Sequence, residues 1–202
     1  MPDLSLELAV GGRVAGIDEA GRGPWAGPVV AAALILAPDI PTSLAQRIDD
    51  SKKLRPNVRA LLFEQLKNYA DIGIGIASVV EIDDLNILQA TMLAMQRALS
   101  AVDAAPDFVL VDGNKVPDLP CPARAIVRGD GRSLSIAGAS LAAKVTRDKL
   151  MIALAAEHPG YGWERNMGYG TAEHRDALNA LGSTPAHRFS FAPVARAARS
   201  HK

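Results

Sequence analysis

Four acidic residues stand in the same local context along this 202-residue chain. Each ends or closely follows a short apolar run and has glycine close by. They are Asp18, Glu19, Asp112 and Asp130. If the preceding runs are parallel strands, their carboxyl ends meet at one edge of a sheet, where open α/β sheets bind ligands. A single Asp before Gly is usually a turn residue, so the repeated context, rather than any one acid, indicates a site.

Clustered carboxylates repel one another, and their pKa values rise unless a cation neutralises them. Oxygen ligands suit hard ions such as Mg²⁺ or Mn²⁺. Two such ions could activate a water and stabilise the leaving oxygen of a phosphodiester. No two histidines have the spacing of zinc ligands. The acids therefore predict a magnesium or manganese site that hydrolyses phosphodiesters.

The adjacent pair Asp18-Glu19 poses a geometric problem, because neighbouring residues of a strand point to opposite faces. Both can reach one site if the strand ends at Asp18 and the chain turns at once. Gly21 and Gly23 make such a turn possible.

The apolar runs and their periodicity predict an α/β fold. Runs of strand length are residues 14–18, 29–36, 72–76, 108–111 and about 125–127. Helical patterns begin at Pro56 and cover residues 85–99, 135 to about 157, and about 172–181. This arrangement is neither a strict alternation nor an all-strand meander, so we expect a mixed sheet with helices on both faces.

The domain organisation follows from the absence of a low-complexity linker or internal repeat. We expect a catalytic domain over residues 12–160 and a small helical extension over residues 161–202, packed as one structural unit. His174 and His187, in the extension, are expected to be structural.

Bulk composition narrows the class of protein. The 22 basic and 22 acidic residues balance, which argues against a globally basic nucleic-acid binder but allows a local basic face. One cysteine, no basic and apolar leader, and no apolar run long enough to span a bilayer predict a cytoplasmic protein away from membranes. No feature indicates an obligate protein partner.

Several motifs together resemble the bacterial ribonuclease HII family, in order over nearly the whole chain. They are residues 16–24 (GIDEAGRGP), 50–54 (DSKKL), 111–114 (VDGN), 135–140 (SIAGAS), 143–148 (AKVTRD) and 187–191 (HRFSF). The resemblance implies an RNase H-like fold with a mixed five-stranded sheet. It also implies hydrolysis of the RNA strand of RNA–DNA hybrids, and incision at ribonucleotides embedded in duplex DNA, leaving 5′-phosphate and 3′-hydroxyl ends. The four acids already singled out match the metal-binding motifs of the family.

The same resemblance implies the residues that bind substrate. The turn Gly21-Arg22-Gly23 matches backbone groups that contact the ribose 2′-hydroxyl, the group that distinguishes RNA from DNA. Tyr169 matches a tyrosine that stacks on a neighbouring sugar, but Gly170 stands where the family has proline, so a looser loop is expected. Further expected contacts to the substrate or active site are Lys52, Lys53, Asn86 and Lys144.

Parts of the sequence are also compatible with three other functions. A dinucleotide site at residues 21–27 would need a helix next, whereas residues 29–36 favour a strand. A non-catalytic hybrid-binding module could use the basic segments and Tyr169 but has no need of four converging acids. A metal-dependent DNA nuclease is the alternative enzyme.

Overall fold

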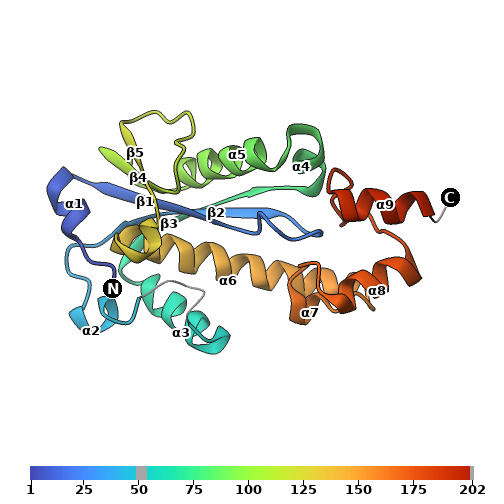
Figure 1. Ribbon diagram of the computed structural model, residues 1–202. Coiled ribbons are helices and arrows are strands. Elements are labelled where there is room, and N and C mark those ends of the chain that lie inside the picture. Colours follow the sequence, from blue (N-terminus) through green and yellow to red (C-terminus); the bar gives the residue numbers. More distant parts are fainter. Residues whose placement is uncertain (49–53, 201–202) are drawn as a thin grey trace.

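A five-stranded mixed sheet forms the centre of the computed structural model, which describes residues 1–48 and 54–200 (Figure 1). The strands are β1 (Val14–Ala20), β2 (Val29–Leu36), β3 (Ala70–Ala77), β4 (Phe108–Asp112) and β5 (Ala123–Ile126). Their order across the sheet is β3-β2-β1-β4-β5. β1, β4 and β5 run parallel, while β2 is antiparallel to β1 and β3. The predicted mixed sheet, with three parallel strands leading to the acids, is confirmed.

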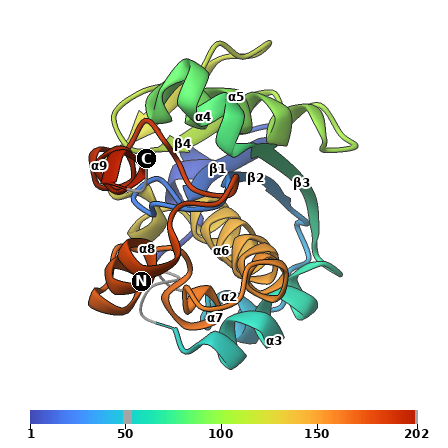
Figure 2. The same ribbon diagram turned by 90° about the vertical axis from the view of Figure 1, so that its right-hand side faces the viewer.

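Helices cover both faces of the sheet (Figure 2). α5 (Ile87–Ser100) packs on one face, while α3 (Pro56–Leu66) and α6 (Leu134–Glu157) pack on the other. Gly16 of β1 allows the start of α6 to approach closely, since a Cβ there would lie 2.2 Å from the carbonyl carbon of Ser135. This backbone contact brings the middle of α6 alongside the end of β1.

Shorter helices complete the described chain: α1 (Ser5–Val10), α2 (Thr42–Ala45), α4 (Val79–Leu85), α7 (Trp163–Asn166), α8 (Ala172–Leu181), α9 (Ala192–Ser200) and the 3-10 turn η1 (Gly129–Gly131). α7, α8 and α9 gather beyond one end of the sheet, around the end of α6 (Figure 1). They lie within residues 161–202, and the division of the chain into a catalytic domain and a helical extension stays a prediction. Among the described helices, none is long and apolar enough to cross a membrane.

The bounds predicted for β1 and β5 are wrong. β1 does not end at Asp18, because β2 is long enough to continue the ladder and pairs Ala31 with Glu19 and Val30 with Ala20. β5 begins and ends earlier than expected, at Ala123 and Ile126, because its register with β4 ends where Ile126 meets Asp112.

The apolar stripe over residues 85–99 is also not one helix. Asn86, with a φ of 70°, separates α4 from α5. Its side-chain oxygen accepts hydrogen bonds from the amides of Leu88 and Gln89 and so caps α5. The spacing of apolar residues continues across this break and so did not predict it. A single residue with a left-handed backbone does not change that spacing.

Candidate active site

Asp18 lies at the buried floor of the site, on the last part of β1. Its side chain is 5% exposed, and one carboxylate oxygen accepts a hydrogen bond from the amide of Glu19 at 2.7 Å. The hydroxyl of Ser140, on α6, also hydrogen-bonds to it. Burial raises the pKa of Asp18 well above its ordinary value, and the charges of Glu19 and Asp112 raise it further.

Glu19 belongs to the same electrostatic group although β1 continues past it. Burial raises its pKa, the guanidinium of Arg22 opposes that shift, and the charge of Asp112 adds to it. Arg22 donates to a Glu19 carboxylate oxygen at 3.3 Å. The charge of Asp112 therefore raises the pKa of both Asp18 and Glu19. The two acids share one site although the strand does not turn at Asp18 as predicted.

Asp112 ends β4 and is tied to the next acid-bearing segment. One of its carboxylate oxygens accepts a hydrogen bond from the amide of Gly129 at 2.6 Å. Gly129 opens η1, and Asp130 is the next residue, half-buried. The sheet therefore brings the ends of β1, β4 and β5 together, as parallel strands require.

These acids have the chemistry of a site for hard divalent cations. We call Asp18, Glu19 and Asp112 the acidic edge. The pKa values of Asp18 and Glu19 are raised, first by burial and then by the negative charges close to them. A divalent cation would relieve that repulsion. In the described part of the chain, no three acid, histidine or cysteine side chains already surround a single ion position. The donor set fits Mg²⁺ or Mn²⁺, and the individual roles of the four acids stay predictions.

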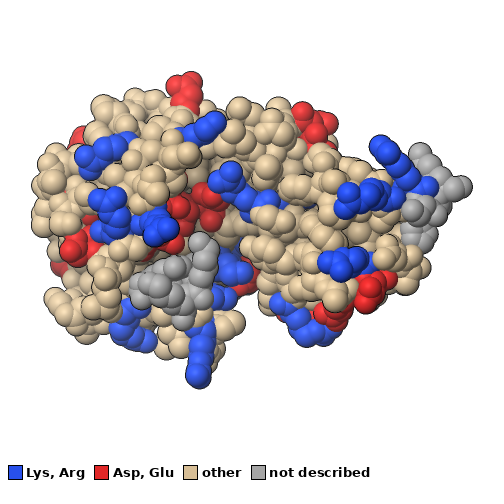
Figure 3. Space-filling model, viewed as in Figure 1, with Lys and Arg blue, Asp and Glu red and all other residues tan. Residues whose placement is uncertain are grey.

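A cleft of about 480 Å³ lies beside Glu19. It is lined by Glu19, Ala20, Gly21, Arg22, Gly23, Arg59, Ser140, Lys144, Arg147 and Tyr169. On the face drawn in Figure 3, acidic atoms lie at the centre of a hollow with basic side chains around them. Five residues predicted from the sequence to contact substrate thus line one cleft next to the acids: Gly21, Arg22, Gly23, Lys144 and Tyr169.

Tyr169 and the glycine turn lie side by side in the lining of this cleft. A Cβ built on Gly23 would lie 3.5 Å from the Tyr169 ring, whose side chain is 47% exposed. The Trp25 indole occupies the space beside Gly170, with a ring atom 2.1 Å from where its Cβ would be. The looser loop expected from Gly170 stays a prediction. The amide of Trp25 also donates to the carbonyl of Gly168 at 2.8 Å.

Two cations at the wall of the cleft share one carboxylate. Lys144 donates to Asp148 at 2.7 Å, one turn along α6, and Arg59 of α3 approaches the other oxygen of Asp148 at 3.4 Å. Asp148 thus orients both cations from behind the cleft. Lys144 was predicted, whereas Arg59 was missed because nothing near it in the sequence indicates that α3 meets α6.

Three other predicted contacts lie elsewhere. Lys52 and Lys53 lie outside the described residues. Asn86 does not line the cleft, and its side-chain oxygen caps α5. A contact between Asn86 and substrate stays a prediction.

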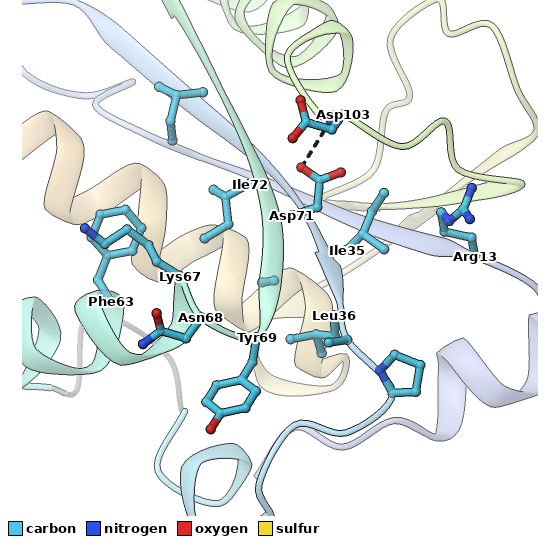
Figure 4. A pocket seen from close by; sticks show the side chains of 14 residues that line it. Arg13, Ile35, Leu36, Phe63, Lys67, Asn68, Tyr69, Asp71, Ile72 and Asp103 are labelled. Atoms are coloured by element: carbon cyan, nitrogen blue, oxygen red, sulfur yellow. Dashed lines mark hydrogen bonds between the residues drawn. The ribbon is translucent and has the colours of Figure 1, made fainter.

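A larger groove, of about 810 Å³, lies at the opposite end of β1. Figure 4 shows its lining residues, among them Arg13, Lys67, Tyr69 and Asp71. Asp71 accepts hydrogen bonds from the amides of Asp103 and Ala104 and so anchors a turn. Size alone would select this groove, but the acidic edge lies beside the smaller cleft.

Sequence reasoning also missed the buried arginines behind the cleft. Arg147 and Arg188 are 1% and 0% exposed and bind backbone carbonyls of residues 21–28. Both stand inside motifs that carried the family resemblance. Their immediate neighbours, Thr146 and Asp148 for Arg147 and His187 and Phe189 for Arg188, do not reveal what either guanidinium binds.

Comparisons with known proteins agree with this geometry. The sequence model of the family described as "Ribonuclease HII" matches residues 15–194. A ribonuclease HII of Paramagnetospirillum magneticum is 61% identical over 197 residues, covering 97% of this chain and 98% of the relative. One of Rhodospirillum rubrum is 61% identical over 200 residues, covering 98% and 92%.

The solved structures show the same fold. The crystal structure of ribonuclease H2 from Pyrococcus horikoshii superposes with a TM-score of 0.78 and 25% identity, covering 93% of this chain and 98% of that one. The structure of Bst-RNase HIII in complex with Mn²⁺ has a TM-score of 0.74 and 17% identity, covering 94% and 70%. The mixed sheet with acids at the ends of its parallel strands thus defines an RNase H-like, metal-dependent nuclease. Within that class, the chain belongs to the ribonuclease HII family, and it cleaves the RNA strand of RNA–DNA hybrids.

Proposed function

We propose that this ribonuclease H also incises duplex DNA at single embedded ribonucleotides, leaving 5′-phosphate and 3′-hydroxyl ends. The observation that carries the proposal is the position of the Gly21-Arg22-Gly23 turn. It lies between the acidic edge and Tyr169 in one cleft, so a single ribonucleotide can be sensed directly beside the acids.

The proposed metal site uses two divalent cations, Mg²⁺ or Mn²⁺, at Asp18, Glu19, Asp112 and Asp130. When bound, they would activate the attacking water and stabilise the departing 3′-oxygen. The Mn²⁺ complex of Bst-RNase HIII supports the choice of hard cation. The buried acidic edge supports it independently. Burial and the charges of Glu19 and Asp112 raise the pKa of Asp18, and a divalent cation would relieve that repulsion.

The remaining steps belong to side chains and backbone of the cleft. The exposed amides of the turn would hydrogen-bond to the 2′-hydroxyl, which only RNA carries. The ring of Tyr169 would stack on the sugar next to the ribonucleotide. Lys144 and Arg59, held by Asp148, place positive charge where a phosphate of the strand would pass.

The test uses three duplexes of one sequence: all DNA, DNA with one ribonucleotide, and a full RNA–DNA hybrid. Each is incubated with Mg²⁺, with Mn²⁺ and with a chelator, and the product ends are mapped. We expect metal-dependent incision of the hybrid and of the duplex with one ribonucleotide, and none of all-DNA duplex. Cleavage of the hybrid without incision at the single ribonucleotide would contradict the proposal and leave the family activity intact.

A further inference from the structure

Arg188 uses its whole guanidinium group on the backbone of one turn. It is fully buried, and its nitrogens donate five hydrogen bonds of 2.6 to 3.1 Å. The acceptors are the carbonyls of Gly21, Arg22, Pro24, Gly27 and Pro28. An arginine has five N–H donors, so each of them is used here within residues 21–28.

Arg147 supports the same turn from α6. It donates to the carbonyls of Ala26 and Pro28, and a third bond reaches the carbonyl of Met167, two residues before Tyr169. Its side chain also fills the space beside Gly21, where a Cβ would lie 2.0 Å from its Nε atom. The two arginines thus connect the glycine turn to the segment that carries Tyr169.

The direction of these carbonyls determines the direction of two amides. A trans peptide places its C=O and the N–H of the next residue on opposite sides, and no described peptide bond is cis. Because Arg188 draws the carbonyls of Gly21 and Arg22 inward, the amides of Arg22 and Gly23 point away from it. Within the described residues, neither amide donates a hydrogen bond.

We propose that Arg188 is a positioning residue for ribose recognition, which holds the amides of Arg22 and Gly23 outward so that they can bind the 2′-hydroxyl. This inference rests on the proposed function, because it concerns how that turn recognises RNA. Arg188 itself does not touch the substrate. It acts through the backbone that it holds.

Lysine could not replace this group. The guanidinium is planar and offers five donors in a rigid fork, whereas an ammonium offers three from one atom. Burial and the neighbouring charge of Arg147 lower the pKa of Arg188 to about 9, so it remains charged near neutral pH. The carbonyl dipoles of the turn, rather than a carboxylate bonded to it, satisfy that charge.

The first test compares Arg188→Lys with wild type in binding, without divalent cations so that no strand is cut. The measured quantity is the ratio of affinities for a duplex with one ribonucleotide and for the same all-DNA duplex. Losing about one hydrogen bond to the 2′-hydroxyl should lower this ratio roughly 5- to 10-fold. Affinity for all-DNA duplex should stay within about twofold, since phosphate contacts are untouched.

Asp83→Ala is the matched control. Asp83 accepts hydrogen bonds from the amides of Phe189 and Ser190, so the variant loosens the segment next to Arg188 without removing a bond to the turn. It should keep the wild-type ratio. If both variants lower the ratio equally, Arg188 is only a structural anchor and the inference is overturned.

A second measurement needs no variant and decides the matter if Arg188→Lys does not fold. Amide hydrogen exchange is followed by NMR at Arg22 and Gly23 of the wild-type protein, free and bound to each duplex. Fast exchange in the free protein, with protection by the ribonucleotide duplex only, supports the inference. Protection in the free protein, or equal protection by both duplexes, overturns it. If wild type shows no preference for the ribonucleotide duplex, the proposed function itself fails first.

Discussion

Only Ala20 separates Glu19 of the acidic edge from the glycine turn in the sequence, yet the two regions differ in how their charged and polar groups are balanced. At the acidic edge, Asp18 and Glu19 are carboxylates whose buried charges repel each other and that of Asp112. At the turn, two buried arginines satisfy backbone carbonyls, and among the described residues no carboxylate is hydrogen-bonded to either guanidinium. Under the proposed function, the first region is completed by cations from solution. In the second, the carbonyls are already bonded in the free chain, and the amides of Arg22 and Gly23 are left to bind substrate. Chemistry and recognition therefore differ in what each still has to bind.

The largest expected effect is at the acidic edge. Asp112→Asn removes one charge but keeps an oxygen that can accept from the amide of Gly129, so the fold should persist. Cleavage of a hybrid should fall by at least about 1000-fold, equivalent to about 4 kcal/mol of transition-state stabilisation. Single-turnover rates with saturating Mg²⁺ measure this. Asp118→Asn, an exposed acid on the following loop, should cut normally, and near-normal cutting by Asp112→Asn would remove it from the metal site.

The second-largest expected effect is the stabilisation of the protein by metal, which should depend on the acidic edge. Mn²⁺ at about 100 times its Kd should stabilise the wild-type protein by about 2.7 kcal/mol, because only the folded acidic edge binds it. Asp18→Asn should be more stable than wild type in the metal-free state, since it no longer buries a repelled carboxylate, and should lose most of the metal response. Urea unfolding with and without Mn²⁺ provides the comparison. An undiminished metal response in this variant would place the cation elsewhere.

The stability of the part of the protein that carries Tyr169 should depend on pH through the buried pair His174 and His187. The amide of Thr184 donates to Nδ1 of His187, so Nε2 of His187 carries the proton and donates to Nε2 of His174, 3.1 Å away. That atom of His174 also accepts from the Trp163 indole, which leaves its Nδ1–H to donate to the carbonyl of Tyr169. A further proton on either ring would place two donors face to face.

Burial, followed by the charge of His174, lowers the pKa of His187 to about 4, and burial also lowers that of His174. A depressed folded-state pKa means that stability is full above about pH 6.5 and is lost as pH falls towards 4. From pH 7.5 to 5.0 the loss from His187 should be about 2 kcal/mol. Urea unfolding of wild type and His187→Gln at both pH values tests this, and an unchanged pH dependence in the variant would exclude the pair as its source.

The sequence predicted the acidic edge better than the turn's support, and the reason is physical. Asp112 follows a buried strand, and parallel pairing converts that local position into a shared sheet edge. The continuation of β1 past Asp18 depends instead on its partners in β2, and the break at Asn86 depends on one backbone dihedral. Neither changes the apolar pattern that the prediction used.

Arg188 shows where sequence reasoning stops. Its bonds to Gly21 and Pro28 join residues 167 and 160 positions apart. Such a side-chain contact with a backbone carbonyl requires no particular residue type at the acceptor, so no pairing pattern reveals it. The motif containing Arg188 indicated the family, but only the packed structure assigns its guanidinium to the turn.

The smallest expected effect tests whether the turn and Tyr169 recognise substrate together. Tyr169→Phe keeps the ring beside Gly23 and should change kcat/KM on a single-ribonucleotide duplex by less than about twofold. Tyr169→Ala removes the stacking surface and should lower it about 10-fold, within the range for aromatic stacking on nucleic acid. Tyr69→Ala, in the distant groove of Figure 4, is the aromatic control and should leave kcat/KM unchanged. Equal losses for Phe and Ala at position 169 would assign the effect to the hydroxyl and contradict stacking. The expected order would assign contact with the neighbouring sugar to the ring. Ribose selectivity would then come from the backbone of the turn that the two arginines hold.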